Sequence, residues 1–310
     1  MKTVVVALGG NAFSAKGKIS LKSELSFAEK ALESVVGLLR KGFAVAVTHG
    51  NGLQVGNILL RSEAAKKIAY PVSLDVAVAQ SQGELGFIIA SALQNILRRH
   101  GVKREIAVVL TSVLVNQNDP AFSHPSKAIG PFYSRAGAME LKRKGIPVVF
   151  EIGRGYRRVV PSPAPEKIME LNTINALLEK GFIVVCCGGG GIPIARQGRE
   201  FRGVECVVDK DHASALLGCS INAELLLLLT GADCVYLGFG ARKQKPIRKM
   251  TVAVAKGLLK ENQFEPGTMK PKIEAAVEFV ESTGRKAIIT SPGKAIPALN
   301  GKHGTLVSKN

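Results

Sequence analysis

Short apolar runs alternate with helical patterns along the amino-acid sequence. Residues 3–8 form a β-branched run that ends at a glycine pair, and residues 43–47 repeat the same strand pattern. Between the two runs, apolar residues return at the spacing of one helical face: Leu25, Ala28, Leu32, Val35 and Leu39. This strand–helix–strand order predicts a parallel sheet.

The alternation continues to the end of the chain. Further helices are predicted at about 75–99, 166–179, 209–217 and 271–280. Further strands are predicted at 106–115, 182–187, 224–229 and 287–290. Strands that alternate with helices over the whole length are typical of an α/β protein with a doubly wound parallel sheet.

One segment, at about 116–165, interrupts this alternation. It is rich in Pro, Gly, Ser and Arg, with a short helical pattern near 134–144 and strand patterns at 148–152 and 157–160. We interpret this segment as an inserted subdomain or lid.

Length and composition bound the class of protein. At 310 residues and 46% apolar, the chain fits one large α/β domain or two closely joined lobes. The apolar runs at 4–8 and 225–229 are too short for a signal peptide or a membrane span. Five scattered cysteines without a C-x-x-C pair indicate buried thiols in a reducing compartment. We therefore expect a soluble, cytoplasmic protein with no membrane partner.

The net charge of +18, from 42 basic and 24 acidic residues, favours anionic partners. The basic residues occur in short mixed groups with few aromatic residues between them. A nucleic-acid site would need a stacking platform or a reading helix, so no nucleic-acid partner is expected. Small phosphate compounds remain the favoured class of ligand.

Two glycine turns follow the first two strands, Gly9-Gly10-Asn11 and His49-Gly50-Asn51-Gly52. Glycines at the carboxyl ends of parallel strands let backbone N–H groups approach an anion closely. A tight strand-to-helix turn alone would also use Gly and Asn, but two copies at equivalent positions favour an anion site. His49 is expected to order its loop through a hydrogen bond.

A run of four glycines follows the strand predicted at 182–187, and it includes Gly188, Gly189 and Gly190. So much backbone freedom is costly unless something must approach closely. A nucleotide phosphate is the expected ligand, whereas a flexible hairpin turn would need only one or two glycines. The sequence contains no dinucleotide fingerprint and no Walker A motif.

Lysines occur at two predicted helix starts, where a cation opposes the helix dipole by about 0.3–1 kcal/mol. Lys210 follows Asp209, which is a typical helix cap, and Lys270 and Lys272 flank Pro271. Two such helix starts indicate a nearby anion. Lys127 lies between prolines in the insert, from which it could reach over the crevice.

Taken together, the motifs resemble those of the carbamate kinases in the amino-acid kinase superfamily. The match runs over nearly the whole chain: ALGGNAF at 7–13, THGNGLQVG at 48–56, SQGELGF at 81–87, PSKAIGPFY at 125–133, RRVVPSPAP at 157–165, GGGGIP at 188–193, VVDKDHASALL at 207–217 and GTMKPKIEAA at 267–276. The motifs at 125–133 and 157–163 are similar to this branch in particular, and not to acetylglutamate, glutamate, aspartate or UMP kinases.

The resemblance implies a three-layer αβα sandwich with a mostly parallel, roughly eight-stranded sheet. It implies a single domain over 1–310 in which an N-terminal lobe, about 1–180, binds carbamate or carbamoyl phosphate. A small subdomain protrudes at about 116–163, and a C-terminal lobe, about 181–310, binds the nucleotide. It also implies a homodimer, and reversible phosphoryl transfer between Mg²⁺-bound ATP and carbamate.

The resemblance also implies roles for individual residues. The carbamoyl phosphate end is assigned to Gly9, Gly10, Asn11, Gly50, Asn51 and Lys127, with Gly52 beside them. Lys210 and Lys272 match the lysines that bridge the transferred phosphoryl group and the nucleotide, and Asp211 matches the acid that holds them. Nucleotide-binding positions are Gly188, Gly189, Gly190, Asp209, Thr230, Tyr236 and Met269. No side chain is assigned as a metal ligand.

Three positions depart from the family pattern. Leu53 replaces a proline, Gly231 replaces an aspartate, and Lys270 replaces a small residue. The last two concern the nucleotide half of the predicted site. Two alternatives to carbamate kinase activity stay open from the sequence: a related kinase that acts on another small acid, and a non-catalytic basic protein with the same fold.

Overall fold

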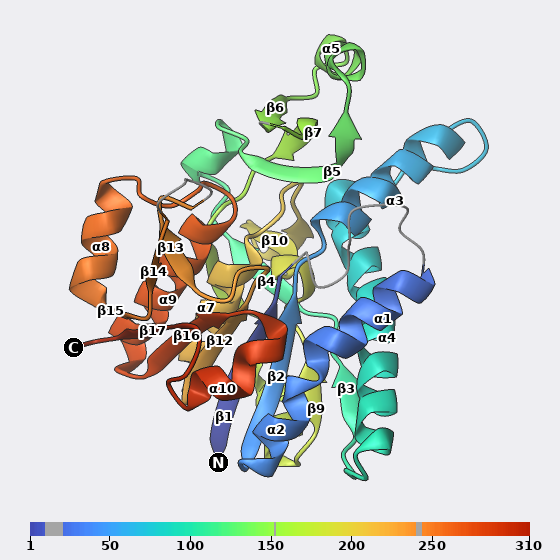
Figure 1. The fold of residues 1–310 in the computed structure, drawn as a ribbon. Helices are drawn as coiled ribbons and strands as arrows, with labels where there is room; N and C mark the ends of the chain where they lie inside the picture. The colour runs from blue at the N-terminus through green and yellow to red at the C-terminus, as the bar shows by residue number, and fades with distance from the viewer. Residues whose placement is uncertain (10–20, 152, 240–243) are drawn as a thin grey trace.

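The computed structural model describes residues 1–9, 21–151, 153–239 and 244–310 (Figure 1). Its centre is an eight-stranded sheet. The strands, in spatial order, are β15 (Lys249–Thr251), β17 (Thr305–Ser308), β16 (Lys286–Thr290), β12 (Leu225–Leu229), β1 (Lys2–Leu8), β2 (Phe43–His49), β9 (Ile183–Val185) and β3 (Ile106–Val108). Neighbouring strands pair in parallel except β16 and β17. The predicted mostly parallel sheet is therefore confirmed.

Alternating side chains of the sheet enter two separate cores, one on each face. Val4, Val6 and Leu8 of β1 point to one core, whereas Val5 and Ala7 point to the other. The helices that contribute to the first core are α1 (Leu21–Leu32), α2 (Ser34–Arg40), α4 (Leu74–Arg99) and α10 (Ala295–Leu299). Those that contribute to the second core are α6 (Leu171–Glu179), α7 (Lys210–Ser220), α8 (Val252–Lys260) and α9 (Met269–Thr283). This is the expected three-layer αβα sandwich.

Smaller sheets lie beside and above the main sheet. A four-stranded sheet has the order β11 (Glu200–Gly203), β10 (Ile192–Gln197), β4 (Ser112–Val115) and β8 (Pro165–Ile168). The predicted protruding subdomain contains α5 (Arg135–Arg143) and a sheet of β5 (Lys127–Tyr133), β7 (Gly155–Val160) and β6 (Val148–Glu151), and it projects from the molecule in Figure 1. A two-stranded ribbon pairs β13 (Val235–Leu237) with β14 (Lys245–Ile247).

The strand predicted at 106–115 is wrong as a single element. It divides into β3, in the main sheet, and β4, in the four-stranded sheet. Between them, the Thr111 N–H donates to the side chain of Gln82 from α4 at 2.8 Å. The Thr111 carbonyl accepts from the Gln82 amide at 3.0 Å and from the Ile192 N–H of β10 at 2.8 Å. A side chain distant in sequence therefore takes the Thr111 N–H, while the Thr111 carbonyl already pairs with the second sheet.

One other prediction needed correction, and one helix was not predicted. The helix predicted at about 166–179 begins only at Leu171, because residues before it form strand β8 and Glu170 accepts a hydrogen bond from the Ser112 backbone at 2.7 Å. Helix α3 (Gly52–Ala65) was not predicted. It packs against β5 so closely that a Cβ atom at Gly56 would overlap the backbone of Gly130.

The main sheet is continuous across the two predicted lobes. Strand β9 lies beyond residue 180 in the chain, yet it pairs with β2 and β3 of the first half. Helix α4 is long and apolar enough to cross a membrane by composition alone. Thirteen of its residues are buried within the protein, and seven of these belong to the first core, which α4 shares with α1 and the sheet.

Candidate active site

The first turn of α7 presents three charged residues in succession. Asp209 caps the helix, since its Oδ1 accepts a hydrogen bond from the Asp211 N–H at 2.8 Å. This was the expected role of an aspartate at this position. Lys210 and Asp211 then occupy the first two helical positions, where both side chains are buried.

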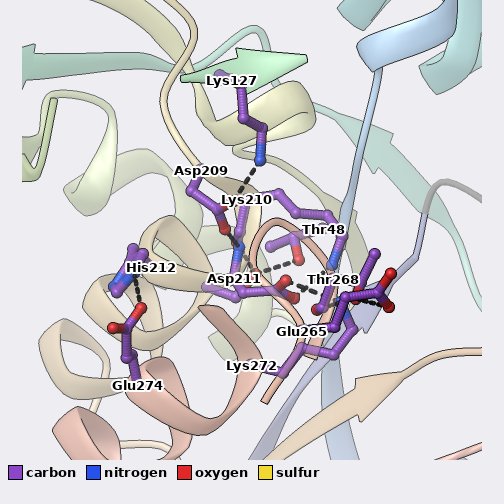
Figure 2. Close-up of polar contacts among 11 residues, drawn as sticks. Thr48, Lys127, Asp209, Lys210, Asp211, His212, Glu265, Thr268, Lys272 and Glu274 are labelled. Carbon is purple, nitrogen blue, oxygen red and sulfur yellow. Dashed lines mark hydrogen bonds and ion pairs between the residues drawn. The ribbon is translucent and has the colours of Figure 1, made fainter. Parts of the chain in front are cut away.

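Asp211 binds two lysines from different helices. Its Oδ1 is in contact with Nζ of Lys210, and its Oδ2 accepts a hydrogen bond from Nζ of Lys272 at 3.0 Å (Figure 2). Lys272 also donates to the carbonyl oxygen of Thr268 at 3.1 Å. Lys210 is 8% exposed and Lys272 7% exposed, so these ammonium groups are shielded from bulk water.

A third lysine reaches the same place from the protruding subdomain. Lys127, the first residue of β5, extends toward α7 and its Nζ contacts Oδ2 of Asp209 (Figure 2). Three ammonium groups from β5, α7 and α9 thus face two carboxylates. This set of five side chains carries one excess positive charge, which favours an anionic ligand.

Burial and mutual charge set the protonation of these groups. Burial lowers the pKa of Lys210 to about 8, and the neighbouring charge of Lys272 acts in the same direction although Asp211 opposes it. Burial also opposes ionisation of Asp211, but the charges of Lys210 and Lys272 outweigh it and lower the pKa of that carboxyl. Lys127 outweighs burial at Asp209 in the same way and lowers its pKa. At neutral pH the Lys210 ammonium and the carboxylates of Asp209 and Asp211 are therefore charged.

The glycine turns after β1 and β2 meet at the carboxyl ends of the parallel strands. The Gly9 N–H donates to the Leu229 carbonyl at 3.0 Å, and the Gly50 N–H donates to the Leu8 carbonyl at 3.2 Å. These two N–H groups are therefore committed to the sheet, contrary to the expectation that they would face an anion. A Cβ atom at Gly9 would lie 2.8 Å from the Leu229 oxygen, which explains this glycine. Gly10 and Asn11 lie outside the described residues.

The glycine run after β9 is also explained by contacts within the protein. A Cβ atom at Gly188 would overlap the His49 ring, and one at Gly189 would overlap the Asn51 amide. At Gly190 it would overlap the Val208 carbonyl group. The close approach predicted from these glycines is thus made by side chains and backbone of the chain, so it is no argument for a nucleotide phosphate.

A buried polar network supports this meeting of loops, and its members were not predicted as site residues. The Asn51 amide donates to Ser81 Oγ at 2.7 Å, so Asn51 is anchored to α4. Gln82 donates to the Gly188 carbonyl at 2.9 Å in addition to its two bonds with Thr111. Ser81 and Gln82 lie on the buried face of α4 between Val78 and Leu85, and polar residues at these otherwise apolar positions were a weak sequence signal for the network.

His49 is buried, and it has the ordering role that the sequence predicted. Its Nδ1 lies 3.3 Å from the carbonyl oxygen of Gly50 in the turn that follows. Burial lowers the pKa of His49 to about 4, and the charge of Lys210 acts in the same direction. The ring is therefore neutral at physiological pH. The preceding residue, Thr48, bonds Ser214 of α7 at 2.6 Å, which ties β2 to the helix of Lys210.

The predicted nucleoside residues lie on three separate segments. Thr230 follows β12 and donates its N–H to the Thr290 carbonyl at 2.9 Å. Tyr236 is in β13, where its hydroxyl donates to Asp233 at 2.7 Å and its ring lies 6.1 Å from that of Phe239. Met269 is the first residue of α9 and packs at the edge of the second core. Within the described parts of the chain, no hydrogen bond joins any two of these three residues.

Metal ligands are scarce near the cluster. Across residues 1–9, 21–151, 153–239 and 244–310, no group of three His, Cys, Asp or Glu side chains could hold a metal ion. All five cysteines are free thiols, four of them buried and Cys219 partly exposed.

Comparison with known proteins assigns the family. Residues 2–291 match the model of the Amino acid kinase family. The chain belongs to this family. It is 42% identical to the carbamate kinase of Thermococcus kodakarensis and 40% identical to carbamate kinase 1 of Enterococcus faecium, over 99% of both chains in each comparison. The resemblance predicted from the motifs is confirmed.

Solved structures of the family agree with this assignment. Carbamate kinase from Giardia lamblia bound to citric acid superposes with a TM-score of 0.94 at 36% identity, covering 100% of this chain and 99% of that one. The same enzyme bound to AMP-PNP superposes with a TM-score of 0.90 over the same shares of the two chains. The architecture of this amino acid kinase is thus shared with carbamate kinases over its whole length.

Proposed function

We propose that this protein is a carbamate kinase, which reversibly transfers a phosphoryl group between ATP and carbamate and so interconverts these with ADP and carbamoyl phosphate. The observation that carries the proposal is the convergence of Lys127, Lys210 and Lys272 on Asp209 and Asp211. Full-length identity of about 40% to named carbamate kinases supports the choice of substrate.

The charge of the cluster suits phosphoryl transfer. In the transition state, negative charge spreads over three equatorial oxygens, and catalysis consists mainly of alignment and charge stabilisation. A lysine about 4 Å from such an oxygen contributes up to ~4 kcal/mol at an effective dielectric of ~20, before desolvation. We expect Lys210 and Lys272 to bridge the transferred group and the nucleotide phosphates, while Asp211 fixes the spacing of their ammonium groups.

The acceptor side would use the glycine turns and the subdomain. Lys127 would bind the carbamoyl phosphate end, together with Gly50, Asn51, Gly52 and the turn at 9–11. The first N–H groups of α3 have no partner within their own helix, as at any helix N-terminus, so they can face an anion. Carbamate is already an anionic oxygen nucleophile, so the proposed reaction needs no general base.

The nucleotide side would be formed by Asp209, Thr230, Tyr236 and Met269, with residues 188–190 nearby. The two departures from the family pattern, Gly231 and Lys270, belong to this side. Gly231 is exposed beside Thr230 and Lys270 is half-buried beside Met269. We therefore expect any difference from other carbamate kinases to appear in nucleotide affinity or base preference.

Mg²⁺ is proposed to accompany the nucleotide. The described residues offer no three-ligand cage, and the two carboxylates of the cluster are already paired with lysines. Mg²⁺ in such sites takes most of its ligands from phosphate oxygens and water, a mode that fits this set of residues. When bound, the ion would neutralise part of the phosphate charge.

We also propose a homodimer that acts in the cytoplasm, with the acceptor bound by the lobe at about 1–180 and the nucleotide by the lobe at about 181–310. Support for the compartment comes from five free thiols, which are typical of a reducing environment. The subunit number is testable by light scattering of the purified protein during size-exclusion chromatography.

The decisive experiment is a coupled assay in both directions. Purified protein with ADP, Mg²⁺ and carbamoyl phosphate should form ATP, and ATP with carbamate should form ADP. Acetylglutamate and UMP are tested in parallel as acceptors. Faster phosphorylation of either one would show that another small acid is the substrate. No phosphoryl transfer, together with nucleic-acid binding that weakens steeply with salt, would favour a non-catalytic protein.

A further inference from the structure

His212 lies between two glutamates, beyond the lysine cluster. It follows Asp211 in the first turn of α7, and its ring nitrogens face two side chains of α9, of which Figure 2 shows Glu274. Nε2 is 3.6 Å from Oε2 of Glu274, and Nδ1 is 3.4 Å from Oε2 of Glu278. A neutral imidazole carries a proton on only one nitrogen, so both contacts are favourable only for the imidazolium.

The charges around His212 favour that form. Burial would lower its pKa, but the two glutamates and the nearby Asp209 outweigh burial and raise the pKa to about 10. The Asp209 carboxylate precedes α7, while Glu274 and Glu278 project from one face of α9 at i and i+4. His212 thus stays positively charged across the physiological range.

The contact between His212 and the two glutamates lies close to the lysine cluster in both helices. His212 is next to Asp211 and two residues from Lys210, whereas Glu274 is two residues from Lys272. A cation in the first turn of α7 opposes the helix dipole, so its stability there depends on the carboxylates of α9. The contact of His212 with the two glutamates therefore forms only when α7 and α9 are packed as observed. The same packing brings Lys210 and Lys272 to the Asp211 carboxylate.

We infer that His212 is a positioning residue: as an imidazolium between Glu274 and Glu278, it fixes the first turn of α7 against α9 and so holds Lys210 and Lys272 on Asp211. This inference rests on the proposed phosphoryl transfer. His212 itself contacts neither Lys210 nor Lys272, and it acts through Asp211 and the two helices.

Substitutions of His212 distinguish a positioning role in catalysis from a general effect on folding. His212→Gln removes the charge, and we expect kcat for ATP formation to fall about tenfold, since small misplacements of reacting groups are costly. The KM for carbamoyl phosphate should change less than about twofold, because Lys127 and the glycine turns are untouched. His212→Arg keeps a cation with several donors and should recover most of kcat. Glu281→Gln, also in α9, breaks an exposed ion pair with Lys256 of α8; it is the control and should match the wild type.

A double-mutant cycle and an NMR titration complete the test. The double variant Glu274→Gln/Glu278→Gln should lower kcat to a similar degree. Adding His212→Gln to it should cause little further loss, because all three substitutions disrupt the same interaction between His212 and the glutamates. In NMR spectra, the imidazole signal that disappears in His212→Gln should not titrate below about pH 9, against about 6.5 for a free histidine.

Three results would overturn the inference: wild-type kcat in His212→Gln, no recovery in His212→Arg, or titration of the His212 ring near pH 6.5. A wild-type protein that forms no ATP would instead refute the proposed function. In that case the NMR titration still decides whether the ring is held as an imidazolium between the glutamates.

Discussion

At the scale of single residues, the site is a balance of buried charge. Lys210 and Lys272 were singled out in the sequence because cations at helix starts are unfavourable, and both bind the same carboxylate of Asp211. The aspartate offsets the desolvation of the Lys210 ammonium only in part, as the lowered pKa of Lys210 indicates. An incoming phosphate would complete this compensation.

Removing either buried lysine should abolish most of the catalysis. We expect Lys210→Ala and Lys272→Ala each to lower kcat for ATP formation by at least ~10²-fold, the scale for losing one preorganised charge contact. Circular dichroism should show an intact fold. Lys256→Ala, which removes a half-exposed lysine of α8, is the matched control and should retain full activity. Near-normal turnover in both site variants would exclude these lysines from the mechanism.

The pH dependence should report Lys210. Its pKa of about 8 means that the ammonium is present at pH 7 and is lost as pH rises through 8. We therefore expect kcat/KM for ADP, which reflects the free enzyme, to fall with an apparent pKa near 8. A bound phosphate stabilises the ammonium, so kcat should fall only at higher pH. In Lys210→Arg, any remaining activity should not show the decrease near pH 8. If the decrease near pH 8 persists in this variant, it reports the titration of another group.

At the scale of elements, the site depends on loops that pack into one another. The turn after β2 and the glycine run after β9 are in direct contact through His49 and Asn51. The subdomain strand β5 packs on α3 and delivers Lys127 to Asp209. Glycine at these points permits close contact between segments that are 74 to 139 positions apart in the sequence, from Gly56 with Gly130 to His49 with Gly188.

The glycine run should be intolerant of even one methyl group. In Gly189→Ala, the new Cβ would overlap the Asn51 amide at a residue with φ of 66°. We expect the free energy of unfolding to fall by about 3 kcal/mol, from backbone strain and overpacking together. Gly198→Ala has a similar φ of 63° but open space around it, so it isolates the backbone cost of about 1 kcal/mol. Equal losses in urea unfolding would argue against the packing account.

Lys127 should act mainly on the acceptor side. We expect Lys127→Ala to raise KM for carbamoyl phosphate about tenfold, the effect of losing one charged hydrogen bond. KM for ADP should change less than about twofold, since Lys210 and Lys272 remain. Initial rates with each substrate varied in turn provide the comparison. An unchanged KM for carbamoyl phosphate would argue against a substrate-binding role for the subdomain.

At the scale of the whole molecule, the fold was predictable where local pattern decides it. The strand–helix alternation predicted β1, β2, β12 and β16 and the helices on both faces, because each buries a regular apolar face. The division between β3 and β4 was not predictable, since the partners of Thr111 at that point, Gln82 and Ile192, are 29 and 81 positions away. Helix α3 was not predicted because glycines weaken its helical pattern. Gly56 is required there by the close contact with Gly130 of β5, which is also distant in sequence.

The site was predictable to a similar extent. Lys210, Lys272 and Lys127 were indicated by unfavourable or constrained positions, whereas the role of Asp211 came only from the family resemblance. The network of Ser81, Gln82 and Thr111 was missed, because buried polar partners distant in sequence leave no periodic signal. The glycine run was recognised correctly as a point of close approach, but the approaching atoms belong to the protein.

The most direct test is a crystal structure with ADP, Mg²⁺, carbamate and aluminium fluoride, which imitates the phosphoryl group during transfer. The account predicts that the fluoride lies within hydrogen-bond distance of Nζ of Lys210 and Lys272, with Lys127 turned from Asp209 toward the same group. A fluoride bound away from these three ammonium groups, or lysines that keep their aspartate contacts and face no ligand, would contradict it.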